Sequence, residues 1–216
     1  MRLLPAESDA IDRRIATVEA RTGVQVLTAV VPRSDSYVEL PWKAFALGTS
    51  LAAPAVVVFD VDLEPWVTSG TPLVHALAIL GSGAAWALLA IFVPAFARWL
   101  LRASHRHAAV KEYAQSLFLR HELFRTRRRT AVLILVSRFE RLVEILPDTG
   151  LHGRIDETEW RQVIDAMAPH LREARPFHAL EAGIAAVESL LVSKGFHAGA
   201  DATNELPNRP IEETRA

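Results

Sequence analysis

Hydrophobic positions are concentrated in the middle of the chain, where residues 71–97 contain no charged side chain. A helix of roughly 20 apolar residues crosses a hydrocarbon core ~30 Å thick, so this run predicts a membrane span. Residues 44–59 form a second uncharged run, which rises only about 24 Å as a helix and contains a proline. This second run spans if the flanking lysine extends its ammonium group to the interface. We therefore predict a membrane hairpin over residues 41–100, with spans of about 42–61 and 73–97.

The segments on either side of the hairpin carry the periodicities of helices and strands. Ser8 is positioned to cap a first helix, which ends near Gly23. Asp156 and Glu159 have the spacing of a capping box and predict the start of another helix. The predicted strands are residues 24–31, 131–137 and 141–146, and the remaining predicted helices cover about residues 104–125, 157–171 and 176–191.

The predicted strands lie on both sides of the hairpin, and neither side has enough of them for a stable sheet alone. One domain interrupted by the hairpin is therefore favoured over two domains. The element order predicts an α/β fold, a small three-layer α/β/α sandwich built from residues 1–40 and 101–196. Residues 197–216 have no clear periodicity and are predicted to form a mobile tail.

Charge is distributed unevenly, although the net charge is only −1. Residues 98–141 carry 11 Lys and Arg against 3 Asp and Glu, whereas the loop 60–71 has no Lys or Arg. By the positive-inside rule, both termini and the sandwich are cytoplasmic, and the chain is a multi-pass protein of the cytoplasmic membrane. The absence of cysteine excludes disulfides, thiolate zinc sites and cysteine nucleophiles.

The best candidate for a catalytic site follows the last predicted strand. Asp148 could serve as a nucleophile or cation ligand, with His152 as acid or base. Asp156 and Glu157 could add ligands for a divalent cation. The alternative is structural, because Asp and Gly favour turns and carboxylates cap helix starts. The sequence predicts no other cofactor.

A run of arginines precedes the most strand-like segment of the chain, and it could bind phosphate, nucleic acid or lipid. No aromatic interleaving or groove-reading motif accompanies it, so no nucleic-acid partner is expected. Beside a membrane, anionic lipid head groups are the simpler ligand. The residues concerned are Arg120, Arg125, Arg127, Arg128 and Arg129.

The chain resembles the TPM-domain family, and within it a bacterial branch in which a membrane hairpin interrupts the domain. The matching stretches are residues 19–31, 125–150, 157–167 and 204–209. The resemblance implies an α/β/α sandwich, and either a phosphatase that binds divalent cations or an assembly or repair factor. It also implies a bacterial inner membrane. The family's usual Asn-Gly before the central strand is replaced here by Thr130 and Ala131, a departure that weighs against phosphatase or metal chemistry.

Three functions follow as expectations. The first is a membrane-anchored, non-catalytic interaction or assembly module with an unidentified protein partner. The second is a weak phosphatase dependent on a divalent cation, suggested by Asp148. The third is a component of an oligomeric transporter, suggested only by the hairpin and by His75 near the outer end of its second helix.

Overall fold

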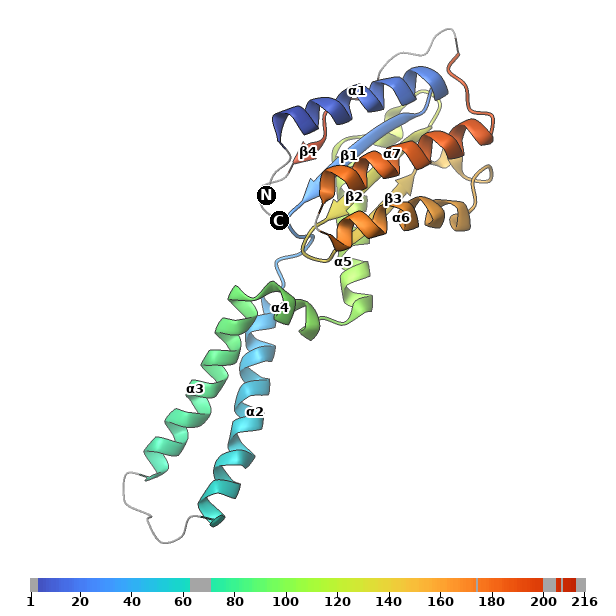
Figure 1. Cartoon of the computed structure of the whole chain (residues 1–216). Coiled ribbons are helices and arrows are strands. Elements are labelled where there is room, and N and C mark those ends of the chain that lie inside the picture. Colours follow the sequence, from blue (N-terminus) through green and yellow to red (C-terminus); the bar gives the residue numbers. More distant parts are fainter. Residues whose placement is uncertain (1–3, 63–70, 174, 200–204, 207, 213–216) are drawn as a thin grey trace. The chain divides into compact units, whose positions relative to one another are not determined.

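The computed structural model describes residues 4–62, 71–173, 175–199, 205–206 and 208–212 (Figure 1). The chain divides into two compact units. Met1–Asp35 together with Arg106–Ala216 form the first, here called the sandwich unit. Ser36–His105 form the second, the hairpin unit. The insertion of one unit into the sequence of the other is the interrupted arrangement that the strand pattern predicted.

A four-stranded sheet forms the centre of the sandwich unit, in the order β3-β2-β1-β4. Its strands are β1 (Gln25–Val31), β2 (Ala131–Ser137), β3 (Leu142–Pro147) and β4 (Ile211–Glu212). β2 and β4 run parallel to β1, and β3 runs antiparallel to β2. Every residue of β1 and β2 is buried, because helices cover both faces of the sheet, and this explains their unbroken apolar sequences.

Strand β4 was missed by the sequence interpretation, which placed a mobile tail over residues 197–216. In the described part of that tail, Ile211 pairs with Ala29 and Glu212 pairs with Val30. A two-residue strand is too short to produce a recognisable alternation, so its pairing with β1 could not be read from the pattern. The tail therefore contributes an edge strand to the sheet.

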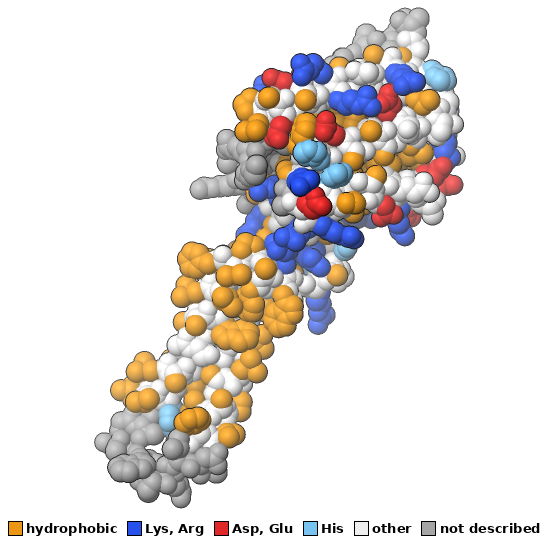
Figure 2. All heavy atoms as spheres, viewed as in Figure 1, with side chains coloured by type: hydrophobic (Ala, Val, Ile, Leu, Met, Phe, Trp, Pro, Cys, Tyr) orange, Lys and Arg blue, Asp and Glu red, His pale blue; other side chains and the backbone are white. Residues whose placement is uncertain are grey.

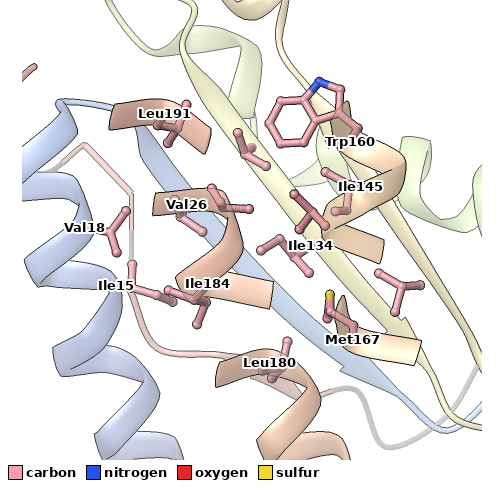
Figure 3. Packing of buried hydrophobic residues seen from close by; sticks show 14 of the residues in the cluster. Ile15, Val18, Val26, Ile134, Ile145, Trp160, Met167, Leu180, Ile184 and Leu191 are labelled. Atoms are coloured by element: carbon pink, nitrogen blue, oxygen red, sulfur yellow. The ribbon is translucent and has the colours of Figure 1, made fainter. Parts of the chain in front are cut away.

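Helices form the outer layers of the sandwich unit (Figure 1). One face of the sheet packs against α1 (Pro5–Thr22), α6 (Glu157–Arg172) and α7 (Pro176–Ser193), and the other packs against α5 (Ala103–Arg120). Figure 3 shows the larger core, in which Ile15, Val26, Ile134 and Ile184 meet between the sheet and α1, α6 and α7. The predicted three-layer α/β/α class is confirmed.

The helix starts test two predicted caps. Asp156 and Glu159 form the predicted capping box of α6, and the Asp156 N–H donates to the Glu159 carboxylate at 2.9 Å. Ser8 does not cap α1, which begins earlier at Pro5; the serine lies inside the helix and is buried. Proline favours the first helical position because it lacks the N–H that would be unpaired there.

The hairpin unit contains two long helices, α2 (Glu39–Asp62) and α3 (Thr71–Phe92), which lie side by side (Figure 1). α2 continues through Pro54 without a break. The second predicted span, residues 73–97, is divided: α3 ends at Phe92, and the short helix α4 (Pro94–Leu100) follows. Pro94 begins α4, since a proline cannot continue the hydrogen-bonding ladder of α3.

Glycines let α2 and α3 approach closely. A Cβ on Gly83 would lie 2.5 Å from Thr49 Cγ2, and one on Gly48 would lie 2.9 Å from Trp86 Cγ. The Ser82 hydroxyl donates to the Gly48 carbonyl at 3.3 Å. Small residues at a helix contact are typical of membrane helix pairs.

Candidate functional site

Asp148, the leading candidate from sequence, lies where β3 meets the short helix η2 (Thr149–Leu151). Its side chain is only 2% exposed. Oδ1 accepts the Thr149 N–H at 2.7 Å and Arg129 Nε at 3.3 Å, and Arg129 Nε also lies 3.1 Å from Oδ2. The Asp148 N–H donates to the Ala131 carbonyl and so continues the pairing of β3 with β2. The carboxylate is therefore held by the fold.

Gly150 lets the turn at Asp148 pack against residues 125–130, here called the arginine loop. Its N–H donates to the Arg129 carbonyl at 2.8 Å. A Cβ at this position would lie 2.5 Å from that oxygen and 2.6 Å from the Arg128 carbonyl oxygen. Arg129 itself adopts a positive φ of 54°. The ion pair between Asp148 and Arg129 joins two tightly packed turns, and this contact supports a structural role for both residues.

The other candidate acids and the histidine lie apart from this ion pair. Asp156 caps α6, and Glu157 is exposed with its carboxylate 3.5 Å from the Arg161 guanidinium. His152 is exposed and lines a cleft along β3. Within the described ranges, no three His, Asp or Glu side chains come together in a way that could hold a metal ion.

The arginine run is divided among different contacts instead of forming one cluster. Arg125 pairs with Glu122 at 2.7 Å, and Arg129 pairs with Asp148. The Arg127 N–H donates to the Glu205 carboxylate at 2.9 Å. Arg128 lies beside Gly23. The guanidinium groups of Arg125 and Arg129 thus face carboxylates of the same chain.

A buried polar cluster at the carboxyl ends of β1 and β2 was missed by the sequence interpretation. The Ser34 N–H donates to Glu140 Oε1 at 3.0 Å, the Ser34 hydroxyl donates to Ser137 Oγ at 3.0 Å, and Ser137 Oγ donates to Glu140 Oε2. Glu140 is 1% exposed. Ser34 lies just before the chain leaves for the hairpin unit, so this cluster fixes the exit point. The turn after β2 has the polar residues of an ordinary surface turn, and nothing in its sequence indicates that Glu140 contacts Ser34.

A second buried carboxylate, Glu19 on α1, was also missed. Its Oε1 accepts the Val26 N–H at 2.9 Å, and its side chain also hydrogen-bonds Asn208 in the tail. Burial raises the pKa of Glu19 from 4.5 to about 7, although these hydrogen bonds oppose the rise. Nearby, Gln25 Oε1 accepts the N–H groups of Glu205 and Leu206. Glu19 and Gln25 therefore hold the tail against the end of α1 and the start of β1.

An open cleft of about 850 Å³ follows the outer edge of β3. Residues of α5 form one wall and residues of α6 form the other, and β3 forms the floor. Buried apolar side chains such as Ile145 and Trp160 lie at its base, while Lys111, Arg161 and His152 are exposed at its rim. The sequence pattern predicted each of these elements but gave no sign of the space between them.

Comparison with known proteins agrees with the resemblance noted from sequence. Residues 94–190 match the family model of the TPM domain. The solution structure of the BA42 protein from the psychrophilic bacterium Bizionia argentinensis has a similar fold, with a TM-score of 0.60. That match has 14% sequence identity and covers 99% of this chain and 97% of BA42, so it supports the fold alone. No curated protein matches the chain.

Proposed function

Because residues 94–190 carry a TPM domain, we propose that this chain is a membrane-anchored TPM protein with a non-catalytic sandwich unit. The sandwich unit acts as an interaction or assembly module at the cytoplasmic surface of a bacterial inner membrane. The hairpin unit is its anchor, and the sandwich unit recognises the partner. Membrane anchoring carries this proposal.

The observation that carries the anchor is the exposed apolar surface of α2 and α3. Glu39–Phe59 and Pro72–Phe92 are long and apolar enough to cross a membrane. Large apolar side chains along them are exposed, including Val57, Phe59 and Leu77 (Figure 2). A soluble protein rarely leaves such a large contiguous apolar surface in water. Lipid covers that surface if the two helices span the bilayer.

The charges at the hairpin ends support a cytoplasmic sandwich unit. Lys43, Arg98 and Arg102 flank the helix ends nearest the sandwich sequence, whereas residues 60–71 contain no Lys or Arg. Most of that connecting loop lies outside the described residues. Exposed Arg127 and Arg128 remain available for anionic lipid head groups, in keeping with the expected lipid contact.

The contacts of Asp148 favour an interaction module over a phosphatase. A nucleophile must reach the substrate and a metal ligand must reach the ion, yet this carboxylate is buried and paired with Arg129. The transporter alternative gains no support from His75, because two helices cannot enclose a path without further copies. The phosphatase alternative predicts that Asp148→Asn abolishes phosphoester hydrolysis by the purified chain. Our proposal predicts no difference in hydrolysis between the two proteins.

Two experiments test the proposal. Single cysteines at Ser69, in the undescribed loop, and at Ser193 would be labelled in intact cells with a membrane-impermeant thiol reagent. We expect labelling at position 69 only; labelling at 193 would place the sandwich unit outside the cytoplasm and reject the topology.

The second experiment is affinity purification of the full chain from detergent after crosslinking in cells. Failure to recover a reproducible partner would contradict the assembly role.

A further inference from the structure

The cleft along β3 contains an unpaired strand edge. β3 is the last strand of the sheet, and within the described residues only β2 pairs with it. The Asp148 N–H donates to Ala131, so the backbone N–H and C=O of Asp148 face β2. Along an antiparallel strand these groups point alternately to one side and the other, so those of every second residue before Asp148 also face β2. Those of Val143, Ile145 and Pro147 therefore point outward. Pro147 lacks an N–H, so its position on the outward side leaves the ladder with β2 complete.

The cleft lies where one more strand would add to the sheet. It measures about 850 Å³ and extends along the whole of β3, from Leu142 to Pro147. Neighbouring strands lie roughly 4.8 Å apart, so an added strand would occupy the space between the α5 and α6 walls. Its side chains would alternate between the two walls. On the α6 side they would meet the apolar surface of Trp160 and Ile164.

The rim of the cleft is basic. Its exposed cationic side chains are Lys111, Arg141, Arg161 and Arg172, joined by the imidazoles of His107 and His152. Its carboxylates are Glu144 and Glu157, and the latter already lies 3.5 Å from Arg161. Burial raises the pKa of Glu144, although the charge of Lys111 opposes that rise. An acidic ligand is thus the electrostatic complement of this cleft.

We propose that this cleft binds an extended acidic segment of a partner protein, which adds to β3 as a fifth strand. The inference rests on the proposed interaction function and names the chemistry of the partner. Main-chain hydrogen bonds to Val143 and Ile145 supply affinity, and the alternating side chains supply specificity. Apolar side chains of the segment contact α6, and acidic side chains meet Lys111 and Arg141.

A second copy of this chain is a poorer occupant. Antiparallel pairing of β3 with another β3 would bring two copies of the same basic rim together. Surfaces of like charge repel each other, whereas an acidic segment is attracted to the rim. An exposed strand edge presents a row of backbone N–H and C=O groups that another strand can pair with. A lipid head group has no matching row of main-chain groups.

The test uses the full chain in detergent and a fluorescent synthetic peptide of alternating glutamate and valine. We expect saturable binding, and slower hydrogen exchange at the Val143 and Ile145 amides when the peptide is bound. N-methylation of the peptide's alternate amides should weaken binding by about tenfold or more, because it removes the donors to β3. Replacement of the glutamates with lysines should have a similar effect.

Matched charge reversals locate the site. Lys111→Glu should weaken peptide binding by about tenfold, whereas Arg13→Glu makes the same charge change on an exposed part of α1 and should leave it unchanged. Circular dichroism would verify that both variants are folded. Equal binding by both variants would overturn the proposal.

Three further results would also overturn it. These are binding unaffected by N-methylation, displacement of the peptide by vesicles of anionic lipid, and dimerisation that Lys111→Glu abolishes. If the peptide fails to bind while a crosslinked partner is still recovered, only this inference fails. If the peptide binds but no partner is recovered from cells, the strand-addition site stands and the assembly role fails.

Discussion

The two units of this chain use apolar residues in opposite ways. In the sandwich unit, the apolar side chains of β1 and β2 are buried between helical layers, and charged groups cover the outside. In the hairpin unit, large apolar side chains of α2 and α3 face outward, and at the contact between the helices a glycine of one helix meets a larger side chain of the other. Exposure to water and the exposure to lipid that we propose for the hairpin unit require these two arrangements.

Glycine marks the closest approach in both units, but what it touches differs. At Gly150 the neighbouring atoms are backbone carbonyl oxygens, which cannot move without displacing a turn. At Gly83 they are the side chains of Thr49 and Phe45, on a helix that can shift as a whole. The same type of substitution should therefore cost more in the sandwich unit than in the hairpin unit.

The largest expected effect is that of Gly150→Ala. Its Cβ would lie 2.5 Å from the Arg129 carbonyl oxygen, so the arginine loop and the Asp148 turn must separate. We expect a loss of about 3 kcal/mol in the stability of the sandwich unit. Hydrogen exchange of β2 amides in the full chain would measure it. Gly199→Ala, with no heavy atom near the added methyl group, is the control. Equal protection in the two variants would contradict the close packing at Gly150.

A smaller effect is expected for Gly83→Leu in the hairpin unit. The new side chain would overlap Thr49 and Phe45 and force α3 away from α2. Crosslinking between cysteines placed on the two helices should fall, while hydrogen exchange of the β2 amides stays unchanged. Gly81→Leu is the matched control, because no heavy atom lies within 4 Å of its added Cβ. If both variants lower crosslinking equally, the glycine contact does not hold the helices together.

Local patterns were sufficient to predict much of the fold. The apolar runs of β1 and β2, the capping box of α6 and the long uncharged stretches all arise from neighbouring residues, so sequence displays them. The interruption by the hairpin followed from the distribution of strands. Strand β4 escaped prediction because its two residues are specified by pairing with Ala29 and Val30, far away in sequence.

The candidate site was harder to interpret for the same reason. The sequence drew attention to Asp148, but its ion pair with Arg129 depends on how two turns pack. Glu140 became significant only through Ser34, across the inserted hairpin. The cleft along β3 is a property of the spacing between α5 and α6, which no periodicity records. Sequence identified the chemical groups, and tertiary packing determined their contacts.

The smallest expected effect concerns pH and distinguishes the buried acid Glu19 from the exposed charges around it. Burial raises its pKa from 4.5 to about 7, so the folded chain holds its proton more tightly than the unfolded chain does. Stability therefore falls as pH rises from about 4.5 to about 7, and the contribution is constant above that range. Partial hydration limits the change to about 2 kcal/mol.

Glu19→Gln should remove this pH dependence, because a neutral amide keeps an oxygen acceptor for the Val26 N–H but does not titrate in this range. Urea unfolding of both proteins at several pH values would give the free energy of unfolding at each pH. The effect is the difference between the two proteins in the slope of that free energy against pH. Glu181→Gln, on an exposed position of α7, controls for the loss of one negative charge. Parallel pH profiles for the two proteins would show instead that Glu19 titrates as an ordinary surface acid.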